Sequence, residues 1–172
     1  KLEFTHRKDP TVFFPANTHE WLPRTLTSIL VKQHCVLPKD FYSGCPRTLV
    51  ELHIQPIDFT PDDAKDLSQA APALTKLAIH FYGSKRKSSR NLLNAFAHLP
   101  RTLINPKLEF YYGNLITPQY LASLPHSLIS LSIEAHRSTV LNDATTLPSL
   151  PPYLRYLHLY GVIPTWFKNP YS

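Results

Sequence analysis

Four side chains that could bind a metal lie close together in the sequence: His34, Cys35, Cys45 and His53. Zinc in proteins prefers four nitrogen or sulfur ligands in tetrahedral geometry, and closely spaced cysteine or histidine pairs commonly supply them. The two cysteines are ten residues apart here, and no closely spaced pair of that kind exists. We therefore expect no metal site, and the sequence indicates no cofactor.

The nine histidines could also act in catalysis, because histidine exchanges a proton near neutral pH. No G-x-S-x-G, H-E-x-x-H, glycine-rich phosphate-loop or Cys-His pattern accompanies them. His53, His80 and His158 fall on or beside strands predicted below. We interpret them as part of a polar, aromatic recognition surface, whose binding could vary with pH near ~6.5. The sequence therefore predicts a protein that is not an enzyme.

One dense run of basic residues spans positions 84–90, and the net charge of the chain is +6. The simplest interpretation is a solvated loop. The alternative is binding of nucleic acid, phosphate or an acidic partner, and a nuclear-import element or phosphorylation of Ser88 and Ser89 would also fit. The residues that would carry the alternative binding function are Lys85, Arg86, Lys87 and Arg90.

A repeated phrase must position all of these residues. It reads L-P-x-x-L-x-x-L-x-I; clear copies begin at Leu22, Cys45 and Leu124, and looser ones at Ala71 and Pro151. Its second half predicts a short strand with alternate residues buried. The last apolar residues of the copies follow one another at steps of 27, 23, 25, 31, 23 and 26 residues: Phe4, Val31, Ile54, Ile79, Phe110, Ile133 and Leu159.

The unit at Leu103–Phe110 is irregular, and its register is left open. Pro106 falls where a core leucine belongs, so we take Leu108-Glu109-Phe110 as its strand. Further proline-containing phrases lie between the strands. In the phrase at Thr60, the threonine can cap a helix that begins at Pro61. We expect short helices of this kind between most of the strands.

The phrase and its spacing resemble the leucine-rich repeat family over nearly the whole chain. The resemblance implies a right-handed α/β solenoid with a parallel β-sheet on the concave face and short helices and loops on the convex face. Residues 1–172 would form a single domain of about six to seven repeats. One departure is that the asparagine or cysteine of the family pattern is absent after each strand.

The resemblance also implies a function, namely binding of another protein through the concave face. Repeats of about 26 residues with convex helices resemble those of F-box-type substrate receptors. A substrate receptor or a scaffold subunit of a larger complex is therefore expected. Bacterial effector ubiquitin ligases use a similar phrase, but theirs is shorter and keeps an asparagine.

The composition bears on the cellular location of the protein. No apolar run approaches the ~20 residues of a membrane span. Cys45 takes the place of Leu22 and Leu124 in the phrase, so we expect it to be a buried free thiol. With only two cysteines, the sequence favours an intracellular location, in the cytoplasm or nucleus. Residues 1–4 read as the end of a strand, so we expect a fragment of a longer protein.

The strand positions that do not enter the core are the candidate binding site. They lie inside each L-x-I pair or directly after it, and on stacked strands they form two parallel columns. Tyrosine and arginine are typical anchors of protein interfaces, although tyrosines could instead pack on the sheet. The predicted partner-binding residues are Lys32, His53, Gln55, His80, Glu109, Tyr111, Glu134, Tyr156, His158 and Tyr160.

Overall fold

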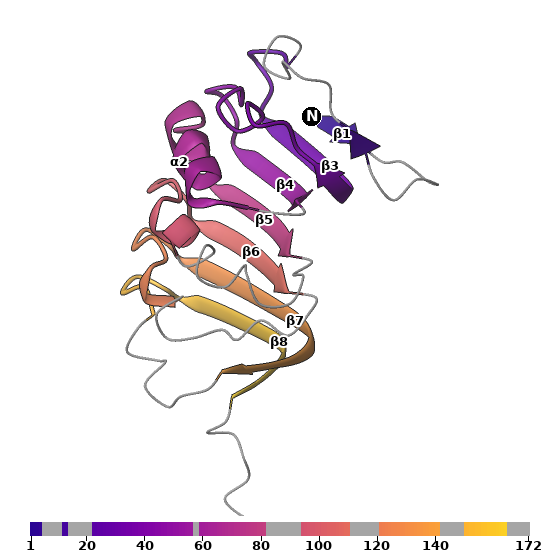
Figure 1. Ribbon diagram of the computed structural model, residues 1–172. Coiled ribbons are helices and arrows are strands. Elements are labelled where there is room, and N and C mark those ends of the chain that lie inside the picture. The colour runs from indigo at the N-terminus through magenta and orange to yellow at the C-terminus, as the bar shows by residue number, and fades with distance from the viewer. Residues whose placement is uncertain are drawn as a thin grey trace, which may run out of the picture.

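The computed structural model describes residues 1–4, 12–13, 22–56, 59–81, 94–110, 121–141 and 150–164. One sheet contains all the strands in this part of the chain, and every pairing in it is parallel. Its order is β1-β3-β4-β5-β6-β7-β8, with β2 pairing to β3 beside this path (Figure 1). The strands are β1 (Leu2–Phe4), β2 (Val12–Phe13), β3 (Ser28–Val36), β4 (Glu51–Pro56), β5 (Lys76–Phe81), β6 (Asn105–Phe110), β7 (Ser130–Leu141) and β8 (Tyr156–Pro164).

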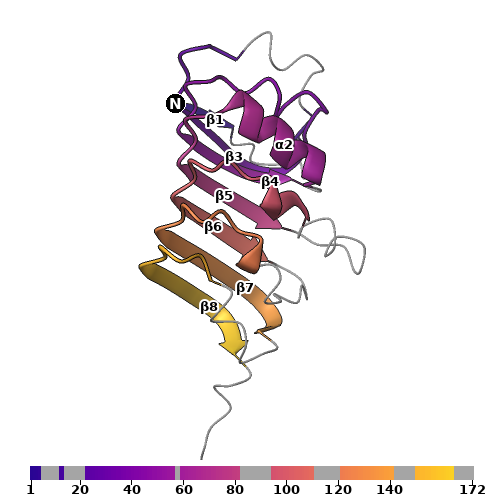
Figure 2. The ribbon, with the colours of Figure 1, turned by 90° about the vertical axis from the view of Figure 1, so that its left-hand side faces the viewer.

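Helical segments and turns cover one face of this sheet. The helix α2 (Pro61–Ala70) connects β4 to β5 and lies against that face, as both ribbon views show (Figures 1 and 2). A short helical segment at residues 94–97 precedes β6. Parallel strands need such crossover connections, and the covered face becomes the convex side of the solenoid. The opposite face of the sheet is concave.

The start of α2 agrees with the sequence prediction. Thr60 is the N-cap, and its hydroxyl accepts a hydrogen bond from the Asp63 N–H at 3.2 Å. The Asp63 carboxylate accepts in return from the Thr60 N–H at 2.8 Å, and Pro61 is the first helical residue. Ala64 and Leu67 bury the inner side of the helix. This capping box satisfies two amides that a helix otherwise leaves without a partner.

The connection from β3 to β4 is one in which no short helix forms. Residues 39–44 form consecutive turns, and the Gly44 N–H donates to the Asp40 carbonyl at 2.8 Å. Pro38 and Pro46 enclose only a short segment, and Pro46 has no N–H to extend a helical ladder. A helix therefore does not propagate here.

The core consists of the apolar positions of the repeated phrase. Val31, Ile54, Ile79 and Ile133 are each at most 1% exposed, as predicted. Leu159 pairs with Ile133 in register, although its side chain lies outside the described residues. Leucines of successive repeats fill the next layer of the same continuous core, at positions 29 to 131 of the chain: Ile29, Leu52, Leu77 and Leu131.

The irregular unit keeps the repeat register, in contrast to the strand chosen for it from the sequence. Pro106 pairs with Leu77 and is buried, and Leu108 pairs with Ile79. A proline ring thus fills the place of a core leucine. Leu108, not Phe110, is the reference residue of this unit, and Glu109 consequently follows the L-x-I pair rather than lying inside it.

The pairing of β3 with β4 also departs from the regular register. Leu30 pairs with His53, but the next printed partners are His34 and Gln55, so β3 carries an irregularity between them. Lys32, predicted to stand beside Gln55, is therefore displaced from that column. An inserted bulge of this kind moves every later residue of one strand relative to its neighbour.

A ladder of hydroxyl groups also joins the repeats, and the sequence analysis did not anticipate it. The Thr or Ser that precedes the first leucine of a unit donates to the carbonyl of the equivalent leucine one repeat earlier. This ladder satisfies carbonyls that the turns leave free. Its members are Thr48 to Leu26 at 2.9 Å, Thr102 to Leu74 at 2.9 Å and Ser127 to Leu103 at 2.8 Å.

Candidate partner-binding surface

Two columns of side chains project from the concave face of β4 to β8. Alternation along each strand brings them to this face while the residues between them enter the core. Strand pairing then sets their neighbours across the sheet. The inner column is His53, Ala78, Lys107, Ser132 and His158, and the column beside it contains His80, Glu109, Glu134 and Tyr160.

His53 and His80 meet at their imidazole rings. The ring centroids are 4.5 Å apart, the ring planes differ by 11°, and the two Nε2 atoms are in contact. Rings stacked face to face would hold these atoms about as far apart as the centroids. The two imidazoles are therefore joined edge to edge, so that one Nε2 can donate to the other.

The other nitrogen of His80 is held by a carboxylate. His80 Nδ1 lies 2.5 Å from Glu109 Oε2, and the two residues are only 7% and 5% exposed. Burial lowers the pKa of His80 from 6.5 to about 4; Glu109 opposes this change, and His53 and Lys107 add to it. His80 Nδ1 lies against the carboxylate without meeting hydrogen-bond geometry, while its Nε2 is in contact with Nε2 of His53.

Lys107 completes the network. Its Nζ lies 2.8 Å from Glu109 Oε1 and 2.9 Å from Glu134 Oε1. The two glutamates are directly paired on β6 and β7, and like charges opposite each other are destabilising. The ammonium group offsets that repulsion, and its hydrogen bonds to the two carboxylates, Glu109 first, raise the pKa of Lys107.

The concave residues of β8 are open to solvent. Tyr156 and Tyr160 are 67% and 61% exposed, and His158 between them is also exposed. β8 ends the order of the sheet, so no further described strand covers its outer side. Even Leu157, at a core position of the repeat, is 37% exposed. This end of the concave face offers aromatic surface.

The predicted site residues therefore fall into distinct groups. His80 and Glu109 are buried and present little surface to a partner, whereas His53, Gln55 and Glu134 are half-buried. Tyr156, His158 and Tyr160 are exposed on one strand. The remaining predictions fall on residues, or on side chains of residues, outside the described part of the chain: Lys32, Tyr111, Lys85, Arg86, Lys87 and Arg90.

Lys107 is the concave residue that the sequence analysis missed. The strand chosen from the sequence put Lys107 outside the L-x-I pair of its unit. The signal that would have found it is the phrase Arg101-Thr102-Leu103, which fixes the unit's start in the same way as the other copies. Counting on from it places Pro106 in the core and Lys107 on the concave face.

Cys45 behaves as the sequence predicted. It is a free thiol, 5% exposed, and its S–H donates to the Phe41 carbonyl at 3.4 Å. Burial raises its pKa to about 12.

Within the described residues, no group of three or more His, Cys, Asp or Glu side chains is arranged to hold a metal ion. In the same part of the chain, no helix has the length and apolar character to cross a membrane.

Comparison with known proteins agrees with this architecture. The chain is similar in structure to LegL7, a leucine-rich repeat-containing protein from Legionella pneumophila, with a TM-score of 0.51 and 16% sequence identity. The match covers 87% of this chain and 54% of LegL7, so the chain spans about half of that protein. No family model and no curated protein matches the sequence. The fold is a leucine-rich-repeat solenoid.

Proposed function

We propose that this chain is a non-enzymatic module that binds another protein through the concave face of its sheet. The observation that carries the proposal is the exposed row Tyr156, His158 and Tyr160 on β8. Tyrosine supplies a large contact area and a hydroxyl for hydrogen bonding, and it is enriched among the residues that dominate binding energy. Within a longer protein or complex, the module would act as a substrate receptor or scaffold subunit.

The polar network supports this role by holding its neighbours in place. Glu134 is fixed by Lys107 and pairs with Tyr160 across the β7–β8 ladder. Side chains that are already ordered lose less entropy when a partner binds. The surface would therefore combine exposed aromatic rings at the edge of the sheet with charged groups of defined position beside them.

Replacement of Tyr160 by alanine tests the proposal. We expect Tyr160→Ala to weaken binding by at least about 1 kcal/mol, roughly fivefold, because an aromatic anchor is removed. The probe is the partner that copurifies with the wild-type chain, identified by mass spectrometry, and calorimetry measures its affinity. Circular dichroism and the thermal midpoint check that the variant still folds.

Tyr153→Ala is the matched control. Tyr153 belongs to the same repeat and is 71% exposed, but it lies in the turn before β8 rather than on the concave face. Its removal should leave affinity unchanged. Equal losses in both variants, or no loss in either, would contradict concave-face binding. The alternative through Lys85, Arg86 and Lys87 predicts instead that replacing these three by alanine abolishes binding and its salt dependence.

A further inference from the structure

A groove of about 410 Å³ lies on the side of the molecule that carries α2, away from the concave residues. α2 forms one wall, and the turn that leads into β6 forms the other. Its volume is within the range of small-ligand sites. The residues around it are Lys65, Ser68, Gln69, Pro72, Ala97, His98, Leu99, Pro100, Arg101 and Thr102.

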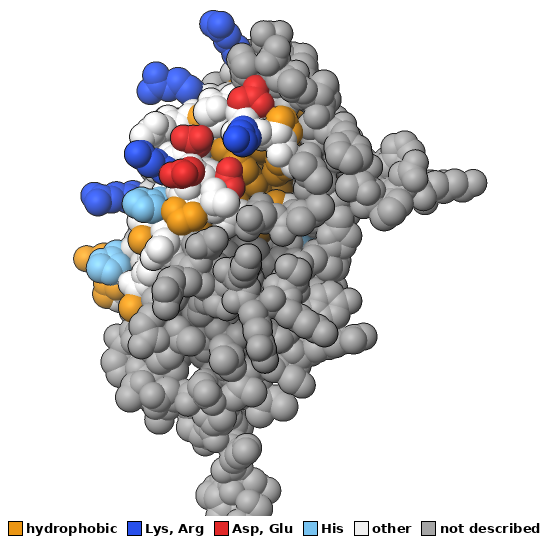
Figure 3. Space-filling model, in the orientation of Figure 1, with side chains coloured by type: hydrophobic (Ala, Val, Ile, Leu, Met, Phe, Trp, Pro, Cys, Tyr) orange, Lys and Arg blue, Asp and Glu red, His pale blue; other side chains and the backbone are white. Residues whose placement is uncertain are grey.

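The lining of this groove has one sign of charge. Lys65 and Arg101 are cationic, His98 is the third basic side chain, and no aspartate or glutamate belongs to the lining. In the described part of the chain, none of these three side chains forms an ion pair. In Figure 3, blue and pale-blue side chains lie along the left-hand edge of the molecule, and red side chains lie beside them outside the groove lining. A groove lined in this way favours an anionic ligand.

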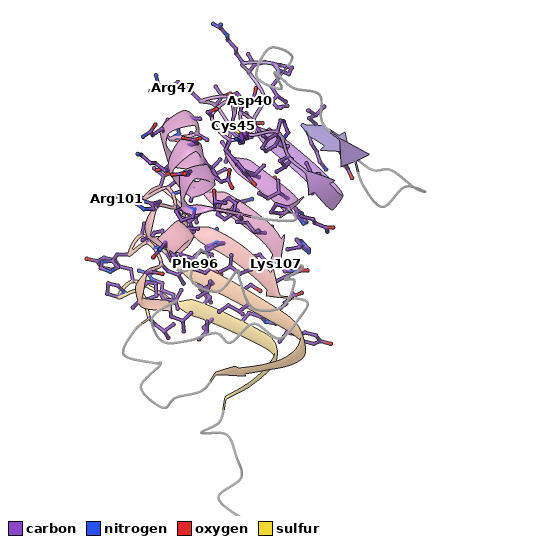
Figure 4. All side chains as sticks on the ribbon, viewed as in Figure 1. Asp40, Cys45, Arg47, Phe96, Arg101 and Lys107 are labelled. Atoms are coloured by element: carbon purple, nitrogen blue, oxygen red, sulfur yellow. The ribbon has the colours of Figure 1, made fainter. Side chains whose placement is uncertain are left out.

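The groove arises from a local departure from the repeat. The residue after the first proline of the phrase is arginine in three units, at Arg24, Arg47 and Arg101. Arg47 and Arg101 lie along the same edge of the molecule, beside α2 (Figure 4). In the unit between them this position is Ala73, so no long side chain stands next to Arg101 there. The exposed ring of Pro72 borders the groove instead.

We propose that this groove binds a peptide segment that carries an oxyanion, either a carboxylate or a phosphate. The oxyanion would sit between the ammonium of Lys65 and the guanidinium of Arg101, which donates two parallel hydrogen bonds to such groups. Ser68 and Gln69, on the same side of α2 as Lys65, add neutral donors. Pro72, Ala97 and Pro100 provide apolar contacts for the peptide's flanking side chains.

Titration of the full chain with three peptides tests the proposal. The peptides are identical except for a central serine, glutamate or phosphoserine, and inorganic phosphate is a fourth probe. Amide NMR spectra report the site. We expect saturable shifts of the residues lining the groove with the glutamate or the phosphoserine peptide, or with both, and none with serine. Binding of inorganic phosphate without either anionic peptide, or no saturable shift with any probe, would overturn the proposal.

Two variants separate the groove from general charge attraction. The double variant Lys65→Gln, Arg101→Gln should bind the anionic peptide roughly tenfold more weakly. The double variant Arg24→Gln, Arg47→Gln removes the same two positive charges at equivalent repeat positions outside the groove and should change affinity less than about twofold. Equal losses in the two would show a diffuse field rather than a site, contradicting the proposal. Tyr160→Ala should leave this binding intact, so failure here is distinct from failure of the concave-face function.

Discussion

Glu109 is a charged residue buried on a face where most side chains meet solvent, and this is possible because its oxygens are all engaged. Lys107 contacts Oε1, and His80 contacts Oε2. A carboxylate removed from water without such partners would destabilise the fold by several kcal/mol. The network therefore orders the centre of the concave face while remaining largely inaccessible to a partner.

The lowered pKa of His80 predicts a specific acid sensitivity. Its pKa is about 4 in the folded chain and 6.5 ordinarily, so the unfolded chain takes up this proton first as pH falls. The stability contributed by neutral His80 is complete above about pH 6.5 and is lost between there and pH 4, on the order of 3 kcal/mol in all. Urea unfolding at a series of pH values measures it.

His80→Gln should flatten this part of the pH profile, since glutamine does not titrate. His126→Gln, at an exposed histidine, is the matched control and should keep the wild-type slope. Wild-type and His80→Gln profiles that run parallel from pH 7 to pH 4 would show that His80 does not carry the effect.

Cys45 should be chemically silent in the native chain. Its thiol is buried, and its pKa is raised to about 12, so almost no thiolate is present at neutral pH. We expect iodoacetamide to leave Cys45 unlabelled for hours in buffer and to label it within minutes in denaturant. Peptide mapping by mass spectrometry distinguishes Cys45 from Cys35. Rapid labelling of Cys45 without denaturant would contradict its burial.

At the scale of single elements, α2 depends on its first turn. It is ten residues long, below the length at which isolated helices are stable in water. Helix propensity alone does not make so short a helix stable. The additional stability comes from the burial of Ala64 and Leu67 and from the capping box at Thr60. The helix also forms one wall of the groove around Lys65, so its position affects that surface.

Removal of the N-cap should therefore be measurable. Thr60→Ala leaves the Asp63 N–H without its acceptor, and we expect a loss of about 1 kcal/mol in the free energy of unfolding. Thr60→Ser retains the hydroxyl and should lose only a few tenths of this. Denaturant titration measures both variants. If serine is no better than alanine, then the hydroxyl is not what stabilises the start of α2.

The molecule as a whole is held together by neighbouring repeats. From β3 to β8, each strand contacts the next one along the chain, and the sheet order follows the sequence. Stability in such a solenoid is approximately a sum over repeats and the interfaces between neighbours. A defect should therefore act mainly near the repeat in which it lies.

Core truncations at two distant repeats test this. Leu52→Ala and Leu131→Ala each remove a fully buried side chain, and we expect each to cost about 2–5 kcal/mol. Amide hydrogen exchange should show the largest loss of protection in β3 to β5 for the first and in β6 to β8 for the second. Uniform loss over the whole sheet in both variants would instead indicate one cooperative unit.

The sequence by itself determined the architecture, because the leucines of each phrase recur at a period that only stacked parallel strands can bury together. Ile54, Ile79 and Ile133 could be identified as core residues for this reason. The cap at Thr60 and the buried thiol of Cys45 could be predicted too, since each depends on a few adjacent residues or on equivalence within the phrase.

Only the tertiary structure decided the register where a unit breaks the phrase, and with it the binding surface. Pro106 was taken as a sign against a core position, yet its ring packs there, and Lys107 rather than Glu109 enters the inner column. The contact of His53 with His80 and the groove between Lys65 and Arg101 join residues from different repeats. Such pairs depend on how strands stack, which a period along one chain does not specify.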